Sequence, residues 1–213
     1  MRLKSFVYLK LVLPVLITSD KLQGLDFLSE ISPEDVGLDS RLAFRYSPSS
    51  KRFLKKVLAQ LHITPQDSII DIGCGKGYAL RTMQKFQFES VDGIELSAHI
   101  ANIAIRNFKK LNSNRSKVFI GDAAQFNEYD IYNYVYFFNP FPSVVMSRVV
   151  NSLVQSVSRS ERKLVIIYMN PTCNDVIVNN SVFVKTGEYC RCGCRIFIYT
   201  NRIYNNLIPS VDI

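Results

Sequence analysis

Three glycines close together in the sequence could bring a ligand against the backbone. Gly73, Gly75 and Gly77 lie in the stretch IIDIGCGKGYAL, just after an apolar run that carries Asp71 near its end. Glycine adopts backbone torsions that other residues resist and leaves space for a close approach. A helix that begins directly afterwards offers free N–H groups. The spacing predicts a loop that binds a nucleotide-like ligand, with a tight structural turn as the alternative.

The residue types exclude two common phosphate-binding loops. A P-loop requires Gly-x4-Gly-Lys-Ser/Thr, whereas Lys76 is followed here by Gly77 and Tyr78. The dinucleotide fingerprint is Gly-x-Gly-x-x-Gly, but these glycines alternate and follow Asp71. Because a carboxylate at this place would repel a pyrophosphate, we expect a ligand that carries positive charge.

The stretch DIGCGKG resembles motif I of the class I S-adenosylmethionine-dependent methyltransferases, whose pattern is Asp/Glu-x-Gly-x-Gly-x-Gly. The resemblance implies that the sulfonium and amino charges of this cofactor lie near Asp71. It further implies that the two oxygens of Glu95 receive the ribose hydroxyls, and that Asp122 in GDAAQF binds the adenine amino group. Leu96 and Ala123, beside these acids, belong to the same predicted cofactor site. A single strand-end acid is as often a helix cap or a solvated turn, but three in this order favour the family.

A second motif, YFFNPFP at 136–142, is expected to face the substrate. Asn139, Pro140 and Phe141 resemble the Asn-Pro-Pro-Tyr type motif of methyltransferases that act on adenine N6 and on glutamine amides. The resemblance implies that Asn139 also borders the cofactor and accepts a hydrogen bond from a nitrogen, so that catalysis is mainly positioning and desolvation. Phe141 stands where the second proline would be, and Pro142 where the aromatic residue would be, which weakens a transfer of adenine specificity. A helix that starts at Phe141 or Pro142, capped by Asn139, is the structural alternative.

Upstream, the stretch RYSPSS adds two candidate residues. The resemblance to the class I methyltransferases covers about residues 46–201, and the combination of RYSPSS, DIGCGKG, YFFNPF and IIYMNP resembles a group of bacterial members of that class. It implies that Tyr46 and Ser47 close over the methionine end of the cofactor. A plain turn at Pro48 explains the same stretch equally well.

Strands and helices alternate along the chain, which is typical of a parallel sheet covered on both faces. The sequence predicts strands at 68–72, 90–96, 117–122, 134–139 and 163–170, and helices at 50–61, 78–86, 97–111 and 143–157. Ser97 is the expected N-cap of the third helix, and positions 144, 145, 149, 150, 153, 154 and 157 should form the buried face of the fourth. Two β-rich runs, 181–190 and 194–201, predict a closing hairpin.

These elements predict an α/β fold, a three-layer sandwich with a seven-stranded, mostly parallel sheet that ends in an antiparallel hairpin. We expect an N-terminal helical cap over residues 1–44 and a methyltransferase domain over 45–213. The run FVYLKLVLPVLIT at 6–18 follows a basic start, but Lys10 and Pro14 interrupt it, and a membrane span needs about 20 apolar residues. It is expected to be a helix packed on the core of a cytoplasmic protein, with a signal or surface anchor as alternatives.

Five cysteines, an odd number, fit a reducing compartment better than a disulfide framework. Cys190, Cys192 and Cys194 lie in CRCGC and could hold a soft metal together with Cys173. Zinc sites generally use Cys-x2-4-Cys, and alternate residues of a strand point to opposite faces. A hairpin turn around Gly193, with no metal site, is therefore the prediction.

The net charge of +8 favours encounters with anionic partners, but no Lys/Arg run or RNA-binding signature decides the matter. His62 and His99 are assigned ordinary surface roles. We expect methyl transfer from S-adenosylmethionine to an acceptor, with a nitrogen on a protein favoured over nucleic acid, a glycan or a small molecule. The hypothesis from another class is a cofactor-binding protein without catalysis that serves as a partner subunit or sensor.

Overall fold

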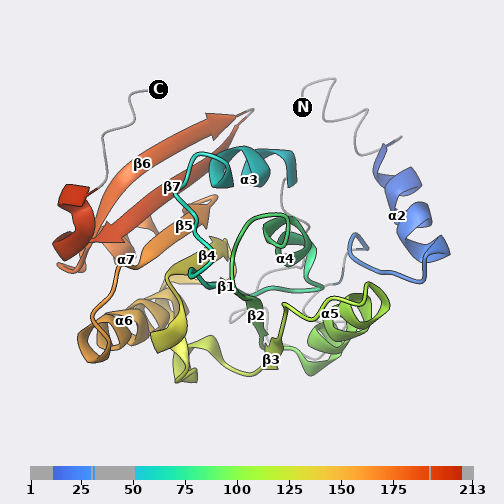
Figure 1. The fold of residues 1–213 in the computed structure, drawn as a ribbon, viewed down its shortest axis with the longest axis horizontal. Helices are drawn as coiled ribbons and strands as arrows, with labels where there is room; N and C mark the ends of the chain where they lie inside the picture. The colour runs from blue at the N-terminus through green and yellow to red at the C-terminus, as the bar shows by residue number, and fades with distance from the viewer. Residues whose placement is uncertain (1–11, 30, 32–50, 192, 208–213) are drawn as a thin grey trace.

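A seven-stranded sheet forms the centre of the protein (Figure 1). The structure is a computed structural model, and it describes residues 12–29, 31, 51–191 and 193–207. The strands are β1 (Ile69–Ile72), β2 (Val91–Glu95), β3 (Val118–Ile120), β4 (Tyr134–Phe138), β5 (Val165–Met169), β6 (Phe183–Arg191) and β7 (Cys194–Asn201). Their order across the sheet is β3-β2-β1-β4-β5-β7-β6.

The directions of the strands confirm the predicted fold class. Strands β1 to β5 pair in parallel, whereas β7 pairs antiparallel with both β5 and β6. Parallel strands end at the same edge of a sheet, and ligands of open α/β sheets bind in the crevice outside those carboxyl ends. The residues that follow β1, β2, β3 and β4 are therefore brought to one edge.

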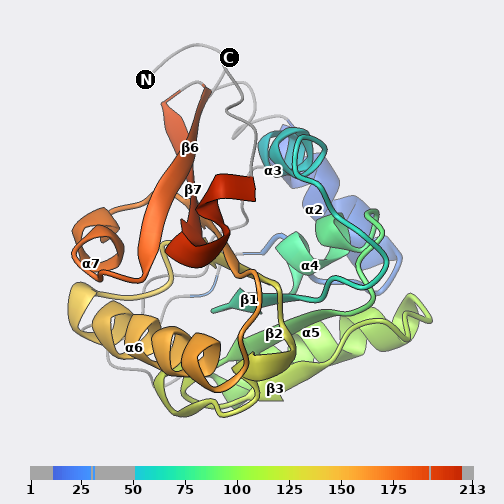
Figure 2. The same cartoon turned by 60° about the vertical axis from the view of Figure 1, so that its left-hand side comes forward.

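Helices cover both faces of the sheet (Figure 2). One face is covered by α3 (Lys51–Leu58), α4 (Tyr78–Met83) and α5 (Ala98–Lys110), and the other by α6 (Ser143–Arg159) and α7 (Asn174–Val178). Alternate strand residues enter the two cores, so that Ile69 packs with the first group and Ile70 with the second. Ser97 caps α5 as predicted, because its side chain accepts a hydrogen bond from the Ile100 N–H at 3.4 Å.

Helix α6 begins at Ser143, as predicted, and differs from the prediction in its buried face. Pro142 is its N-cap and makes no side-chain cap bond, so the structural alternative in which Asn139 caps this helix is wrong. Val144 is 65% exposed, although it was assigned to the buried face, while Met146 is fully buried. Met146 lies three and four residues before Val149 and Val150, and this spacing gives one face of a helix. Helix α7 and the short 3-10 helices at Ala123–Gln125, Tyr129–Ile131 and Arg202–Leu207 were not predicted.

The N-terminal helix α2 spans Leu13–Leu22, which overlaps the later half of the run predicted at 6–18. Leu13 and Ile17 pack against the core beneath α3, α4 and α5. Residues 1–11 and 32–50, which include Tyr46 and Ser47, lie outside the described residues. None of the helices in the described part of the chain has the length and apolar character to span a membrane. The division at residue 44 stays a prediction.

Candidate functional site

The glycine loop joins β1 to α4 in the conformation that its sequence predicts. Gly73, Gly75 and Gly77 all have positive φ, at 76°, 55° and 85°. The N–H groups of Gly73 and Cys74 both donate to the carbonyl oxygen of Ile94, at 2.9 and 3.1 Å. The loop is therefore fixed to the end of the neighbouring strand β2.

Two of these glycines are required by space as well as by torsion. A Cβ atom on Gly77 would lie 2.5 Å from Cε2 of Phe108, and one on Gly73 would lie 2.7 Å from Cβ of Pro140. The contact of Gly73 with Pro140 places the motif after β4 directly against the loop after β1.

Replacing Gly77 by alanine is expected to lower the free energy of unfolding by about 2–4 kcal/mol, since both the left-handed backbone and the clash with Phe108 are costly. The matched control is Gly121→Ala, because nothing lies within 4 Å of a Cβ at that glycine. The control should change stability by less than about 1 kcal/mol. Urea denaturation measures both, and equal values for the two variants would contradict the assigned role of Gly77.

Asp71 is buried at the end of β1, with 2% of its surface exposed. Burial raises the pKa of its carboxyl well above the ordinary value, and the nearby Glu95 raises it further. None of the described residues donates a hydrogen bond to this carboxylate. A buried carboxylate of this kind is stabilised by a cation, and a bound ammonium or sulfonium group would supply one.

Glu95 ends β2 and turns its carboxylate toward the glycine loop. One oxygen accepts from the Gly75 N–H at 3.0 Å and the other from the Ser97 N–H at 2.9 Å. Burial raises the pKa of Glu95, while the backbone N–H groups of Ser97, Gly75 and Leu96 oppose the rise. A carboxylate has about four acceptor positions, so that of Glu95 can still accept a further hydrogen bond.

The third acid, Asp122, lies close to Glu95 in the structure. The N–H of the preceding residue, Gly121, donates to the Glu95 carbonyl at 3.0 Å. The carboxylate of Asp122 accepts from the Ala124 N–H at 2.8 Å and caps the short helix Ala123–Gln125. Ala123 is buried, whereas Leu96 is 42% exposed. The structure thus brings the three predicted acids together at one edge, and the exposed Leu96 follows Glu95 directly in the chain.

The Asn-Pro-Phe motif follows β4, and its three side chains have different environments. Asn139 has a φ of 42°, and its side-chain oxygen accepts a hydrogen bond from the hydroxyl of Thr172 at 2.5 Å. Pro140 is half-buried against Gly73. Phe141 is 7% exposed and packs edge-on against Phe137, with ring centroids 6.3 Å apart. The ring of Phe141 therefore belongs to the core.

Two contacts of the site were missed by sequence reasoning. Thr172 comes from the loop after β5 and reaches Asn139 across the sheet edge. Lys76, between two of the glycines, is fully buried and pairs with Asp26 at 2.8 Å. Thr172 directly follows the stretch IIYMNP, and Asp26 is the acid in LDFLS. The spacing of these residues in the sequence does not predict that Thr172 contacts Asn139 or that Asp26 contacts Lys76.

The cysteine-rich stretch forms the predicted turn. Gly193, with a φ of 85°, lies between β6 and β7, and the four described cysteines, Cys74, Cys173, Cys190 and Cys194, are free thiols. No group of three or more His, Cys, Asp or Glu side chains could hold a metal ion among the residues that the structure describes. Both His62 and His99 are exposed, as predicted.

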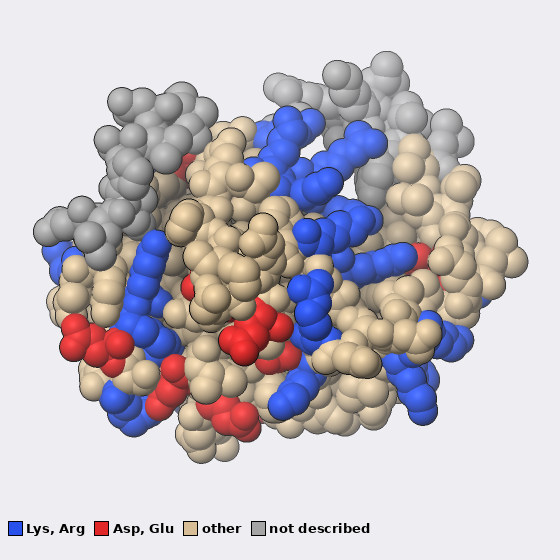
Figure 3. Space-filling view, in the orientation of Figure 1, with Lys and Arg blue, Asp and Glu red and all other residues tan. Residues whose placement is uncertain are grey.

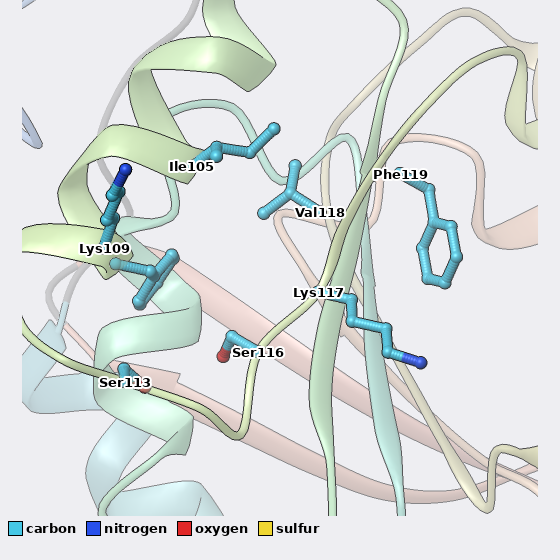
Figure 4. Close-up of a pocket in the computed structure, with 8 residues that line it drawn as sticks. Ile105, Lys109, Ser113, Ser116, Lys117, Val118 and Phe119 are labelled. Atoms are coloured by element: carbon cyan, nitrogen blue, oxygen red, sulfur yellow. The ribbon is translucent and has the colours of Figure 1, made fainter.

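A hollow of about 480 Å³ lies elsewhere, between α5 and β3. It is lined by Ile105, Phe108, Lys109, Ser113, Ser116, Lys117, Val118 and Phe119. Figure 4 shows Lys109 and Lys117 pointing in different directions, and Phe119 on the far side of the strand from Ile105. Because its polar groups do not converge, this hollow is not part of the candidate site.

Comparison with known proteins agrees with the fold. A family model described as a methyltransferase domain matches residues 40–170, more than half of the 213 residues. The protein belongs to this methyltransferase family, and its seven-stranded sheet is that of the class I, S-adenosylmethionine-dependent members.

Individual relatives are more distant. A curated protein of Methanococcus maripaludis, named "Probable cobalt-precorrin-6B C(15)-methyltransferase (decarboxylating)", is 32% identical over 78 residues, which are 36% of this chain and 42% of that protein. This chain therefore spans less than half of the relative's length.

Solved structures share the fold. A mutant of MtNAS in complex with S-adenosylmethionine has a TM-score of 0.56 and 15% identity, over 70% of this chain and 60% of that chain. An RNA methyltransferase from Salinibacter ruber in complex with S-adenosyl-L-homocysteine has a TM-score of 0.58 and 13% identity, over 72% and 93% of the two chains. At these identities the likeness concerns the fold alone.

Proposed function

We propose that this protein transfers a methyl group from S-adenosylmethionine to a nitrogen atom of an acceptor. The observation that carries the proposal is the meeting of the glycine loop, three acids and Asn139 at one sheet edge. Family membership supports the reaction class, and the contact of Gly73 with Pro140 joins the two halves of the site.

The residues present fit the cofactor. Gly73, Gly75 and Gly77 all have positive φ, and the absence of side chains at these positions lets a ligand approach the backbone of the loop. Asp71 would face the cofactor's positive charges, and the carboxylate of Glu95, held by backbone N–H groups, would bind the ribose hydroxyls. Asp122 would bind the adenine amino group, and the exposed side chain of Leu96 would cover the ring.

Asn139 would hold the acceptor. When bound, S-adenosylmethionine supplies the methyl group. The side-chain oxygen of Asn139 accepts from Thr172 and has a second acceptor position for an N–H of the acceptor. Such a bond turns the lone pair of the nitrogen toward the methyl donor, and positioning of this kind contributes a large share of the rate. The proton of the nitrogen can leave to water afterwards, so no strong base is needed.

Two features of the structure bear on the acceptor. Because Phe141 is packed in the core, its ring is not available to stack on a planar base, and this favours a protein nitrogen over adenine. Exposed cations on α3, namely Arg52, Lys55 and Lys56, form no salt bridge with a described carboxylate. Figure 3 shows Lys and Arg side chains gathered over α3 and α4, which supports an acceptor with negative charge.

A small-molecule acceptor is the second candidate. The curated relative is named as a methyltransferase of a cobalt-precorrin, and this name favours a small molecule over a protein.

The acceptor class is tested by incubating the protein with S-adenosylmethionine labelled in the methyl group and a cell extract. The products are then separated into protein, nucleic acid, glycan and small-molecule fractions. We expect N-methyl label in the protein fraction, and label in the small-molecule fraction would favour the second candidate. If the cofactor binds but no fraction is labelled, the protein is a cofactor-binding partner or sensor and the proposed reaction is wrong.

A further inference from the structure

The lysine of the glycine loop is buried and paired with a segment far upstream. The side chain of Lys76 is 0% exposed, and its Nζ atom lies 2.8 Å from Oδ2 of Asp26. The same Nζ also donates to the hydroxyl of Ser29. A buried ammonium group is costly unless it is paired and hydrogen-bonded, and removal of one partner leaves the other charge uncompensated. The conformation of the loop around Lys76 therefore depends on residues 26–29.

The backbone of the loop is held by the same segment. Asn107 of α5 is buried, and its side-chain nitrogen donates to the carbonyl oxygens of Asp26 at 2.9 Å and of Lys76 at 3.2 Å. Its side-chain oxygen accepts from the Asp26 N–H at 2.9 Å. Asn107 thus links the backbone of Asp26 to the backbone of the loop, in addition to the ion pair.

An aromatic contact connects the segment with the third glycine. Phe27 is fully buried and packs against Phe108 and Tyr78, with ring centroids 6.0 and 6.4 Å apart. Phe108 is also the residue that a Cβ on Gly77 would meet. The segment therefore contacts the loop at Lys76 and, through Phe108, at Gly77.

We propose that Asp26 and Lys76 are positioning residues for the cofactor, through which the segment 26–29 keeps the glycine loop in its cofactor-binding conformation. The inference rests on the proposed function, because it assigns the loop to S-adenosylmethionine. It extends the cofactor site to residues upstream of the matched family domain, which begins at residue 40. Through the loop, the Asp26–Lys76 pair affects the affinity for the cofactor, and it leaves the contacts of the acceptor unchanged.

The first test replaces Asp26 by asparagine. If the loop then holds its binding conformation only about a tenth of the time, the apparent Kd for S-adenosylmethionine rises about tenfold. Once the cofactor is saturating, kcat should match that of the wild type. Hydrogen exchange of the amides at 73–77 should become faster, because the loop opens more often. Calorimetry and exchange mass spectrometry measure the two effects.

Two further variants separate positioning from folding. The double variant Asp26→Leu with Lys76→Met removes both charges of this ion pair and should fold, because neither of the two is left buried without the other. It should nevertheless bind the cofactor about as weakly as Asp26→Asn. The matched control is Lys110→Gln, since Lys110 bonds the carbonyl of Gly24, two residues before the segment 26–29, at 2.6 Å and makes no hydrogen bond or ion pair with the described loop residues. The control should keep wild-type affinity.

Wild-type affinity in the double variant, or an equal loss in Lys110→Gln, would overturn the proposal. If the wild type itself does not bind S-adenosylmethionine, the proposed function fails. Hydrogen exchange then still decides whether the segment holds the loop: faster exchange at 73–77 in Asp26→Asn but not in Lys110→Gln supports the coupling, and unchanged exchange refutes it.

Discussion

Replacing Asp71 by asparagine should weaken the binding of S-adenosylmethionine by about 100-fold, since hydrogen bonds to a charged group contribute about 1.5–3 kcal/mol and about 1.4 kcal/mol corresponds to tenfold in affinity. The carboxylate is buried and receives no hydrogen bond from the described residues. Its negative charge therefore favours binding of a cationic ligand and lowers the stability of the folded protein when no ligand is bound. We expect the same substitution to raise the free energy of unfolding of the free protein, because a neutral amide is less costly to bury. Calorimetric titration and urea denaturation measure the two effects.

A matched control is available on the neighbouring strand. Asp92 is also buried, but its carboxylate accepts from the Lys117 N–H at 2.8 Å and from the Tyr132 hydroxyl at 2.9 Å. Replacing Asp92 by asparagine should lower stability by about 1–3 kcal/mol through weakened hydrogen bonds, with little change in cofactor affinity. Equal affinity losses in the two variants would show that Asp71 has no specific role.

The titration of Asp71 predicts how stability depends on pH. Burial and the nearby Glu95 raise its pKa in the folded state. The carboxyl of Asp71 therefore binds its proton more tightly in the folded protein than in the unfolded chain. The stabilising contribution is full below the unfolded pKa and is lost as the pH rises through the folded pKa. We expect the stability advantage of Asp71→Asn to widen over that rise in pH. In the wild type, cofactor affinity should increase over the same range, because the ionised form binds the cation. Urea denaturation and titration at a series of pH values measure both trends, and parallel curves for the two proteins would contradict the assignment.

Replacing Asn139 by glycine should lower kcat by about 100-fold, a typical effect of removing one hydrogen bond that orients the reacting groups. Glycine is chosen because Asn139 has a φ of 42°, which glycine adopts without strain. The Kd for the cofactor should change by less than about threefold, since the substituted amide is assigned mainly to the acceptor. Initial rates of label transfer at saturating cofactor measure the effect.

Thr172→Val provides the companion variant. The hydroxyl of Thr172 bonds the Asn139 side chain, so its loss should allow the amide to rotate and should lower kcat by a smaller factor, about tenfold. Full activity in Asn139→Gly would remove Asn139 from the reaction. A larger loss in Thr172→Val than in Asn139→Gly would assign the central role to Thr172.

Local sequence patterns predicted most of the fold. The alternation of apolar runs and amphipathic stretches predicted the parallel strands. Serine at position 97 predicted the start of α5, and the structure shows the expected capping bond. Val144 was placed on the wrong face because apolar residues at the first turn of α6 do not all face the core. Helix α7, with five residues, is too short to show a period in the sequence.

The parts of the site that could not be predicted are those made by tertiary contacts. The carboxyl ends of parallel strands bring Asp71, Glu95 and Asp122 to one edge, so the acids could be grouped from sequence. The pairing of Lys76 with Asp26 joins residues separated by 50 positions. The burial of Phe141 depends on Phe137 and the start of α6. Neither contact has a periodic signal in the sequence.

Calorimetric titration of the wild type with S-adenosylmethionine, and in parallel with a dinucleotide that carries a pyrophosphate, tests the central claim most directly. The buried carboxylate beside the glycine loop predicts one binding site for S-adenosylmethionine, with a Kd on the order of micromolar to tens of micromolar, and no binding of the dinucleotide. Binding of the dinucleotide without binding of S-adenosylmethionine would contradict the account.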